Sequence, residues 1–156
     1  MLVTLMRHGI AESFARSDAD RRLTDAGERI VDEVILGLKS CGWCPGAIVC
    51  SPLTRSRQTA AIALKHFPGT PLDVLPAVVE ADEALLAELG ARELIDPLVV
   101  GHEPGLSRLA GSLLGARGVL HFQPATVACL RVDALPPRTP AELLFLAPPL
   151  FARLFQ

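Results

Sequence analysis

Short apolar runs alternate along this chain with longer stretches in which apolar residues recur at helical spacing. The runs are rich in Val, Leu and Ile and end abruptly at polar or small residues, which is typical of buried strands. They predict strands over residues 2–6, 47–50, 72–75 and 97–100. The periodic stretches predict helices over residues 25–39, 53–66, 82–89 and 106–114. This alternation indicates a three-layer α/β domain with a mostly parallel sheet.

The last part of the chain has a different pattern. Residues 126–132 and 142–146 are predicted strands, joined by the proline-rich turn 136–140, and a short final helix is expected near 149–154. Residues 13–22 are polar and charged, so we expect a mobile loop there.

Residue types at the helix ends support these boundaries. Thr24 is placed to cap the first helix, and Ser51 is predicted to cap the second helix, with Pro52 in its first turn. Gly42 follows the first helix, where a glycine commonly ends a helix, and Pro45 prevents its continuation.

Composition narrows the class of protein. The 156 residues are half hydrophobic and are expected to form one domain, 1–156. The formal net charge is -2, and no run of five like charges occurs, so no nucleic-acid partner is indicated. The apolar stretch 2–6 is too short for a signal peptide or a membrane span. We expect a soluble cytoplasmic monomer that binds no membrane.

Cys41 and Cys44 have the C-x-x-C spacing of some redox and zinc sites. A zinc site needs about four ligands, and Cys50 and Cys129 offer no second pair at this spacing. We therefore expect a structural role for these cysteines and no disulfide, with a redox role as a remote alternative.

Three predicted strands end in a turn that carries a cation or a histidine. These turns are Arg7–Gly9, Ser51–Pro52 with Arg55 close behind, and Gly101–His102. In an open parallel sheet, ligands bind beyond the carboxyl ends of the strands, where helix amino termini add partial positive charge. Two arginines and two histidines at one such edge predict a site for a compact dianion, most naturally a phosphoryl group.

The residues in these turns and beside them resemble the histidine phosphatase superfamily, whose fold is called phosphoglycerate mutase-like. Four segments match in order, and they cover most of the chain up to about residue 114: "LMRHG" at 5–9, "LTDAGERI" at 23–30, "VCSPLTRSRQTA" at 49–60 and "VVGHEPGLSRL" at 99–109. By size the chain is most similar to the small SixA-type phosphohistidine phosphatases. The resemblance implies a six-stranded sheet, mainly parallel with one antiparallel strand, between layers of helices.

The resemblance also implies roles for the matching residues. His8 would be the nucleophile that becomes phosphorylated, and Arg7, Arg55 and His102 would bind the phosphoryl oxygens, with Gly9 beside them. A neutral imidazole, with a reference pKa near 6.5, is a competent nucleophile at neutral pH. Phosphoryl transfer needs mainly positioning and charge neutralisation, so no metal or cofactor is expected.

The proton donor is the point where this chain departs from larger members of the superfamily. Those proteins supply a glutamate after the third strand, and the matching position here is Ala77. Glu80 or Asp82 could substitute from the same loop, but acids at a helix start are as readily explained without a catalytic role.

Protein phosphohistidine is the leading substrate hypothesis, with a protein of the histidine phosphotransfer type as the partner. Pro71 lies only 16 positions after Arg55, so the pocket should be open enough for a bulky substrate. A phosphatase or mutase for a small phosphorylated metabolite is one alternative, and a weakly active phosphate-binding module is another. Arg57, His66 and His121 have no comparable context and are assigned ordinary surface roles.

Overall fold

The computed structural model describes residues 1–116 and 118–150, and within them six strands form a single sheet. The strands are β1 (Leu2–Arg7), β2 (Ala47–Cys50), β3 (Leu72–Val74), β4 (Pro97–Gly101), β5 (Val127–Arg131) and β6 (Glu142–Ala147). Their order across the sheet is β3-β2-β4-β1-β5-β6. Neighbours from β3 to β1 pair in parallel, whereas β5 runs antiparallel to both β1 and β6. The predicted mainly parallel sheet with one antiparallel strand is confirmed.

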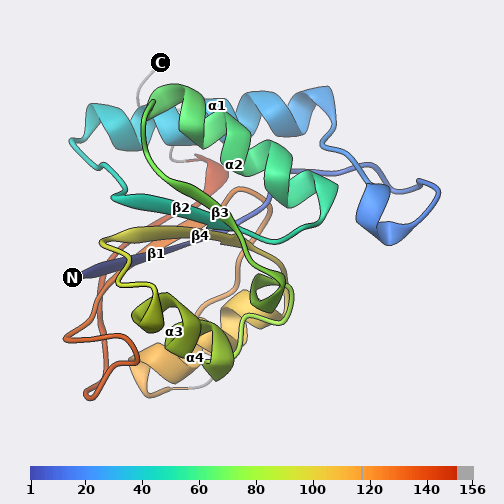
Figure 1. Ribbon diagram of the computed structural model, residues 1–156. Coiled ribbons are helices and arrows are strands. Elements are labelled where there is room, and N and C mark those ends of the chain that lie inside the picture. The colour runs from blue at the N-terminus through green and yellow to red at the C-terminus, as the bar shows by residue number, and fades with distance from the viewer. Residues whose placement is uncertain (117, 151–156) are drawn as a thin grey trace.

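Helices cover both faces of the sheet (Figure 1). They are α1 (Asp25–Ser40), α2 (Thr54–His66), α3 (Glu83–Ala91) and α4 (Gly105–Leu114). Figure 1 shows α1 and α2 on one face and α3 and α4 on the other. The three-layer α/β fold predicted from the alternation of apolar runs and periodic stretches is therefore correct.

Burial on both faces explains why the central strands are continuously apolar. Val3 and Leu5 of β1 pack into the core beneath α3 and α4, whereas Met6 packs into the core beneath α1 and α2. In β4, Val99 faces the first of these cores and Val100 the second. Each strand thus contributes alternate side chains to two cores.

The helix ends differ in detail from the prediction. The Thr24 side chain caps α1 by accepting from the Gly27 amide at 3.0 Å, as predicted. The Ser51 prediction is wrong, because α2 begins at Thr54 with Leu53 as its N-cap residue and has no side-chain cap. Asp82 is the N-cap of α3 rather than its first residue, and its carboxylate accepts from the Ala84 amide at 3.0 Å. The short helix predicted near 149–154 falls mostly outside the described residues.

The segment between β1 and α1 leaves the body of the protein at the carboxyl edge of the sheet (Figure 1). It contains a short 3-10 turn, η1 (Asp18–Asp20), and is closed at its base by a bridge between Ala11 and Leu23. A second 3-10 turn, η2 (Pro76–Val78), follows β3. Over the described part of the chain, no helix combines the length and the apolarity that crossing a membrane requires.

Candidate active site

The predicted site residues meet at the carboxyl edge of the sheet. β1 and β4 pair in parallel with Arg7 aligned to Gly101, so the next residues, His8 and His102, leave the sheet side by side. The centroids of the two imidazole rings are 5.0 Å apart. Arg55 reaches the same place from the first turn of α2. The structure thus brings together the side chains of His8, His102 and Arg55 from three separate segments of the sequence.

The His8 ring is held with one nitrogen free to act as a base or nucleophile. Its Nδ1 lies 2.7 Å from the Gly9 carbonyl oxygen, which can only accept, so the proton is assigned to Nδ1. Nε2 then carries the lone pair, and it accepts a hydrogen bond from Arg55 Nε at 3.2 Å. The side chain is buried, with 7% of the residue exposed.

Burial and neighbouring charge keep both histidines neutral. Desolvation is the largest cause that lowers the pKa of His8 to about 4; the Gly9 carbonyl opposes it, and the positive charges of Arg55, Arg7 and Arg21 add to it. Desolvation, followed by the proximity of His8 and Arg55, lowers the pKa of His102 to about 3. At neutral pH the ring of His8 is therefore an uncharged imidazole among fixed cations.

Arg7 is fixed through a neighbouring loop. Its Nη1 donates to the Phe122 carbonyl at 2.8 Å, and the Phe122 amide donates to Glu103 Oε1, also at 2.8 Å. Arg7 Nε and His102 Nδ1 are buried and have no hydrogen-bond partner among the described residues. Unpaired buried polar atoms are rare in folded proteins, and a polar ligand bound at this edge would give both of them a partner.

Gly9 is required here for close approach rather than for an unusual backbone angle. A Cβ at this position would lie 2.7 Å from Val31 Cγ2 and 3.0 Å from the Gly27 carbonyl oxygen, both in α1. The Gly9 amide donates to Thr59 Oγ1 at 3.1 Å. Gly9 thus lets α1 and α2 pack directly against the end of β1 and fixes the turn that presents His8.

Sequence reasoning missed four residues that support the site. Ser51, expected as a helix cap, has its Oγ 2.6 Å from His102 Nε2. Thr59 and Glu103 fix the turns that hold His8 and Arg7. Asp18, in η1, accepts two hydrogen bonds from Arg55. All four are ordinary polar residues in the sequence, and only the folded contacts reveal them.

The predicted proton donors make none of these contacts. Ala77 is partly buried against the core beneath α3 and α4, so an apolar side chain occupies the position aligned with the glutamate of larger members. The Glu80 side chain is 74% exposed and lies 3.6 Å from Arg108 Nη2. The Asp82 carboxylate is occupied as the cap of α3.

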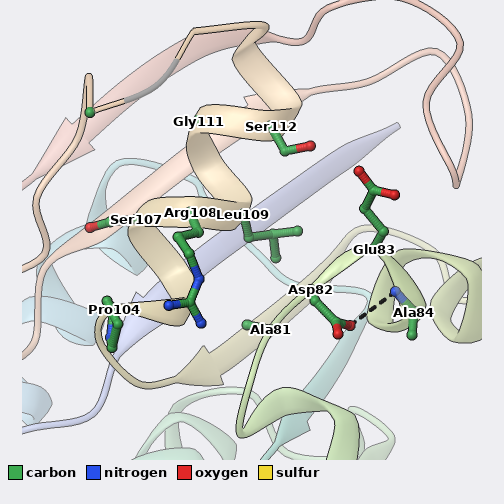
Figure 2. Close-up of a pocket in the computed structure, with 11 residues that line it drawn as sticks. Ala81, Asp82, Glu83, Ala84, Pro104, Ser107, Arg108, Leu109, Gly111 and Ser112 are labelled. Carbon is green, nitrogen blue, oxygen red and sulfur yellow. Dashed lines mark hydrogen bonds between the residues drawn. The ribbon is translucent and has the colours of Figure 1, made fainter.

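An open groove of about 740 Å³ lies on the α3 and α4 side of the molecule, and none of His8, Arg55 and His102 lines it. It runs between the first turns of α3 and α4, and its lining starts at Pro104, two residues after His102 (Figure 2). Glu83 of α3 and Arg108 of α4 line it, together with apolar and small residues such as Leu109 and Gly111.

The residues assigned to the surface take ordinary positions. Arg57 is exposed on α2, His66 lies 2.7 Å from Asp32 Oδ1, and the His121 side chain is 79% exposed. The cysteines are free thiols, with Cys41 and Cys44 exposed. Among the described side chains, no three of His, Cys, Asp or Glu are grouped so that they could hold a metal ion.

Known proteins share both the sequence pattern and this fold. Residues 3–96 match the model of the histidine phosphatase superfamily (branch 1). An uncharacterized protein from Picosynechococcus sp. (strain ATCC 27264 / PCC 7002 / PR-6) is 32% identical, over 96% of this chain and 97% of its own. The chain belongs to the histidine phosphatase superfamily. The family resemblance proposed from the four sequence segments is confirmed, and membership supports phosphatase activity.

Solved structures of histidine phosphatases share the whole architecture. The protein histidine phosphatase SixA complexed with tungstate superposes with a TM-score of 0.85 at 24% identity, covering 96% of this chain and 98% of SixA. An alpha-ribazole phosphatase from Shigella flexneri gives a TM-score of 0.73 at 16% identity, covering 94% of this chain and 96% of its own. These likenesses establish the fold, which is shared by enzymes with different substrates.

We predict that His8 and His102 titrate far below the ordinary imidazole pKa of about 6.5. NMR titration of the free protein should place their ring pKa values at about 4 and about 3, with His8→Ala used to assign the signals. In the unfolded chain both imidazoles are protonated near their ordinary pKa, whereas in the folded protein they stay neutral to lower pH. The free energy of unfolding should therefore decrease as pH falls from about 6.5 toward 4. A midpoint for His8 at or above the ordinary value would show that the ring is solvated.

Arg55 and Arg57 form a matched pair on one helix. Arg55 contacts His8 and is 6% exposed, whereas Arg57 is exposed. Arg55→Ala should lower kcat/KM about 10²–10³-fold, the usual cost of a donor to a developing anion. Arg57→Ala should change it less than about threefold, because surface charges interact weakly with a distant site. Equal losses in steady-state assays of the two variants would contradict the placement of Arg55.

Proposed function

We propose that this protein is a metal-independent phosphohistidine phosphatase that works through a phosphorylated His8. The observation that carries the proposal is the geometry of His8: its buried ring has Nδ1 2.7 Å from the Gly9 carbonyl oxygen and Nε2 3.2 Å from Arg55 Nε. A neutral imidazole with cations around it can accept a phosphoryl group and stabilise the charge that develops on its oxygens.

The reaction takes two steps. His8 Nε2 attacks phosphorus in line with the leaving nitrogen of a phosphohistidine whose ring is protonated. The new N–P bond forms as the old one breaks, and the substrate ring takes the bonding electron pair and leaves as a neutral imidazole that keeps its proton. Arg7, Arg55 and His102 donate to the phosphoryl oxygens throughout. Water then attacks the phosphorus of phosphorylated His8, which yields inorganic phosphate and restores the ring.

Two features favour a protein phosphohistidine over an alkyl phosphate. An alkoxide is strongly basic and needs a donated proton, whereas a protonated phosphohistidine leaves as neutral imidazole. The position aligned with the family's glutamate is Ala77, and Glu80 points its exposed carboxylate toward Arg108. Pro104, two residues after His102, also lines an open groove, which leaves room for polypeptide on one side of a phosphorylated side chain.

A metabolite phosphatase is the second candidate. It is favoured by the fold shared with an alpha-ribazole phosphatase and by Glu83 and Arg108, two charged residues that line the groove and could bind a small polar molecule. Assays with substrates of both classes distinguish these two candidates.

We predict that a phosphohistidine protein is hydrolysed faster than a phosphoserine protein or sugar phosphates in a side-by-side panel. Wild-type protein quenched during turnover should carry an acid-labile, base-stable phosphate on His8, detectable by mass spectrometry. His8→Ala should lose all turnover and keep its fold, as judged by circular dichroism. Preference for a sugar phosphate would select the metabolite phosphatase, and turnover that survives in His8→Ala would refute the phosphoenzyme.

A second prediction concerns the missing acid. Glu80→Gln and Asp82→Asn should each leave phosphohistidine turnover within about tenfold of wild type, well short of the 10²–10⁴-fold typical of a general acid. Asp82→Asn keeps an oxygen that can cap α3, so its fold should be retained. Efficient hydrolysis of an alkyl phosphate that collapses in Glu80→Gln would identify Glu80 as the acid and overturn the phosphohistidine preference.

A further inference from the structure

Arg55 is held at three points, and two of them belong to a single residue. Its Nε donates to His8 Nε2 at 3.2 Å, its Nη1 to the main-chain carbonyl of Asp18 at 2.7 Å, and its Nη2 to Asp18 Oδ2 at 3.0 Å. The two terminal nitrogens are thus both engaged by Asp18, and the Nε edge is left toward the nucleophile. A planar guanidinium bound in this way has a defined orientation.

The segment that carries Asp18 is itself anchored. The other carboxylate oxygen of Asp18 accepts from Arg21 Nη1 at 3.0 Å, and Arg21 Nε donates to the Glu12 carbonyl at 2.5 Å. The base of the segment is attached to α2 by the Leu23 amide, which donates to Gln58 Oε1 at 2.8 Å. The position of Asp18 is therefore fixed from both sides of η1.

The contact between Asp18 and Arg55 does little for overall stability. The Asp18 side chain is 65% exposed, so solvent screens the ion pair, and such surface pairs contribute little to folding. The Arg55 side chain, by contrast, is only 8% exposed and ends against the reactive nitrogen of His8. A small rotation of its guanidinium would move the donors away from the oxygens of a transferring phosphoryl group, where errors of about 1 Å are costly.

We propose that Asp18 is a positioning residue for phosphoryl transfer, which sets the orientation of the Arg55 guanidinium against His8. The proposal rests on the proposed function for the role of Arg55 and extends it to the segment between β1 and α1. Asp18 acts through Arg55 and does not touch the phosphoryl group. The negative charge of Asp18 also lies near the site proposed for a dianion. If Asp18 acted mainly by repelling that dianion, its removal would raise the rate; if it orients Arg55, its removal lowers the rate.

Asp18→Ala should lower kcat/KM for an aryl phosphate about tenfold or more, mainly through kcat, and should weaken tungstate binding measured by calorimetry. Asp18→Asn keeps an acceptor oxygen opposite Arg55 Nη2 and should stay within about threefold of wild type. Asp20→Ala is the matched control, because Asp20 is an acid in the same turn whose carboxylate accepts from Ser17 instead of Arg55. It should match wild type within about twofold, as an exposed charge without that contact should.

The decisive measurement introduces Asp18→Ala into a protein that already lacks the Arg55 guanidinium. In an Arg55→Ala background, followed by single-turnover kinetics, Asp18→Ala should cost less than about twofold, because residues that act as a unit are not additive. The same loss with and without Arg55, or a gain in rate and in tungstate affinity in Asp18→Ala, would overturn the proposal. Wild-type protein that binds tungstate but hydrolyses no phosphoryl compound would refute the proposed function instead, and tungstate affinity would still test Asp18.

Discussion

The site depends on the parallel pairing of β1 with β4. This pairing aligns Arg7 with Gly101, so that His8 and His102 leave neighbouring strands at the same level and their rings come within 5.0 Å. A change of one residue in register would turn the side chains of β4 to opposite faces of the sheet. Because Val99 and Val100 face two separate cores, such a change would also disrupt the packing of both helical layers.

The helices then decide the chemical state of the paired histidines. Gly9 allows α1 to approach the end of β1, and α2 brings Arg55 onto His8 Nε2, so the ring loses contact with water. Loss of hydration disfavours the charged imidazolium, and the neighbouring arginines disfavour it further. The same packing that buries His8 therefore keeps its ring neutral and sets fixed positive charges beside it.

The His8 and His102 side chains and the surfaces around them belong to different parts of the fold. The strand ends that carry His8 and His102 are positioned by the sheet, which is the rigid part of the fold. The groove that begins at Pro104 and the segment that carries Asp18 lie on loops and helix starts around it. Such loops vary without cost to the core, which explains how one fold serves phosphatases with different substrates.

Most of the fold was predictable because apolar runs and helical periodicity are local properties of the chain. The order of strands and helices, the Thr24 cap and the convergence of His8, Arg55 and His102 at one edge all followed from it, and the four family-like segments named the superfamily. The contacts of Ser51 and Asp18 were not predictable, since a serine before a proline and an aspartate in a polar loop suit many local structures. Only tertiary packing decided that Ser51 meets His102 and that Asp18 holds Arg55, because these hydrogen bonds join residues 51 and 37 positions apart in the chain.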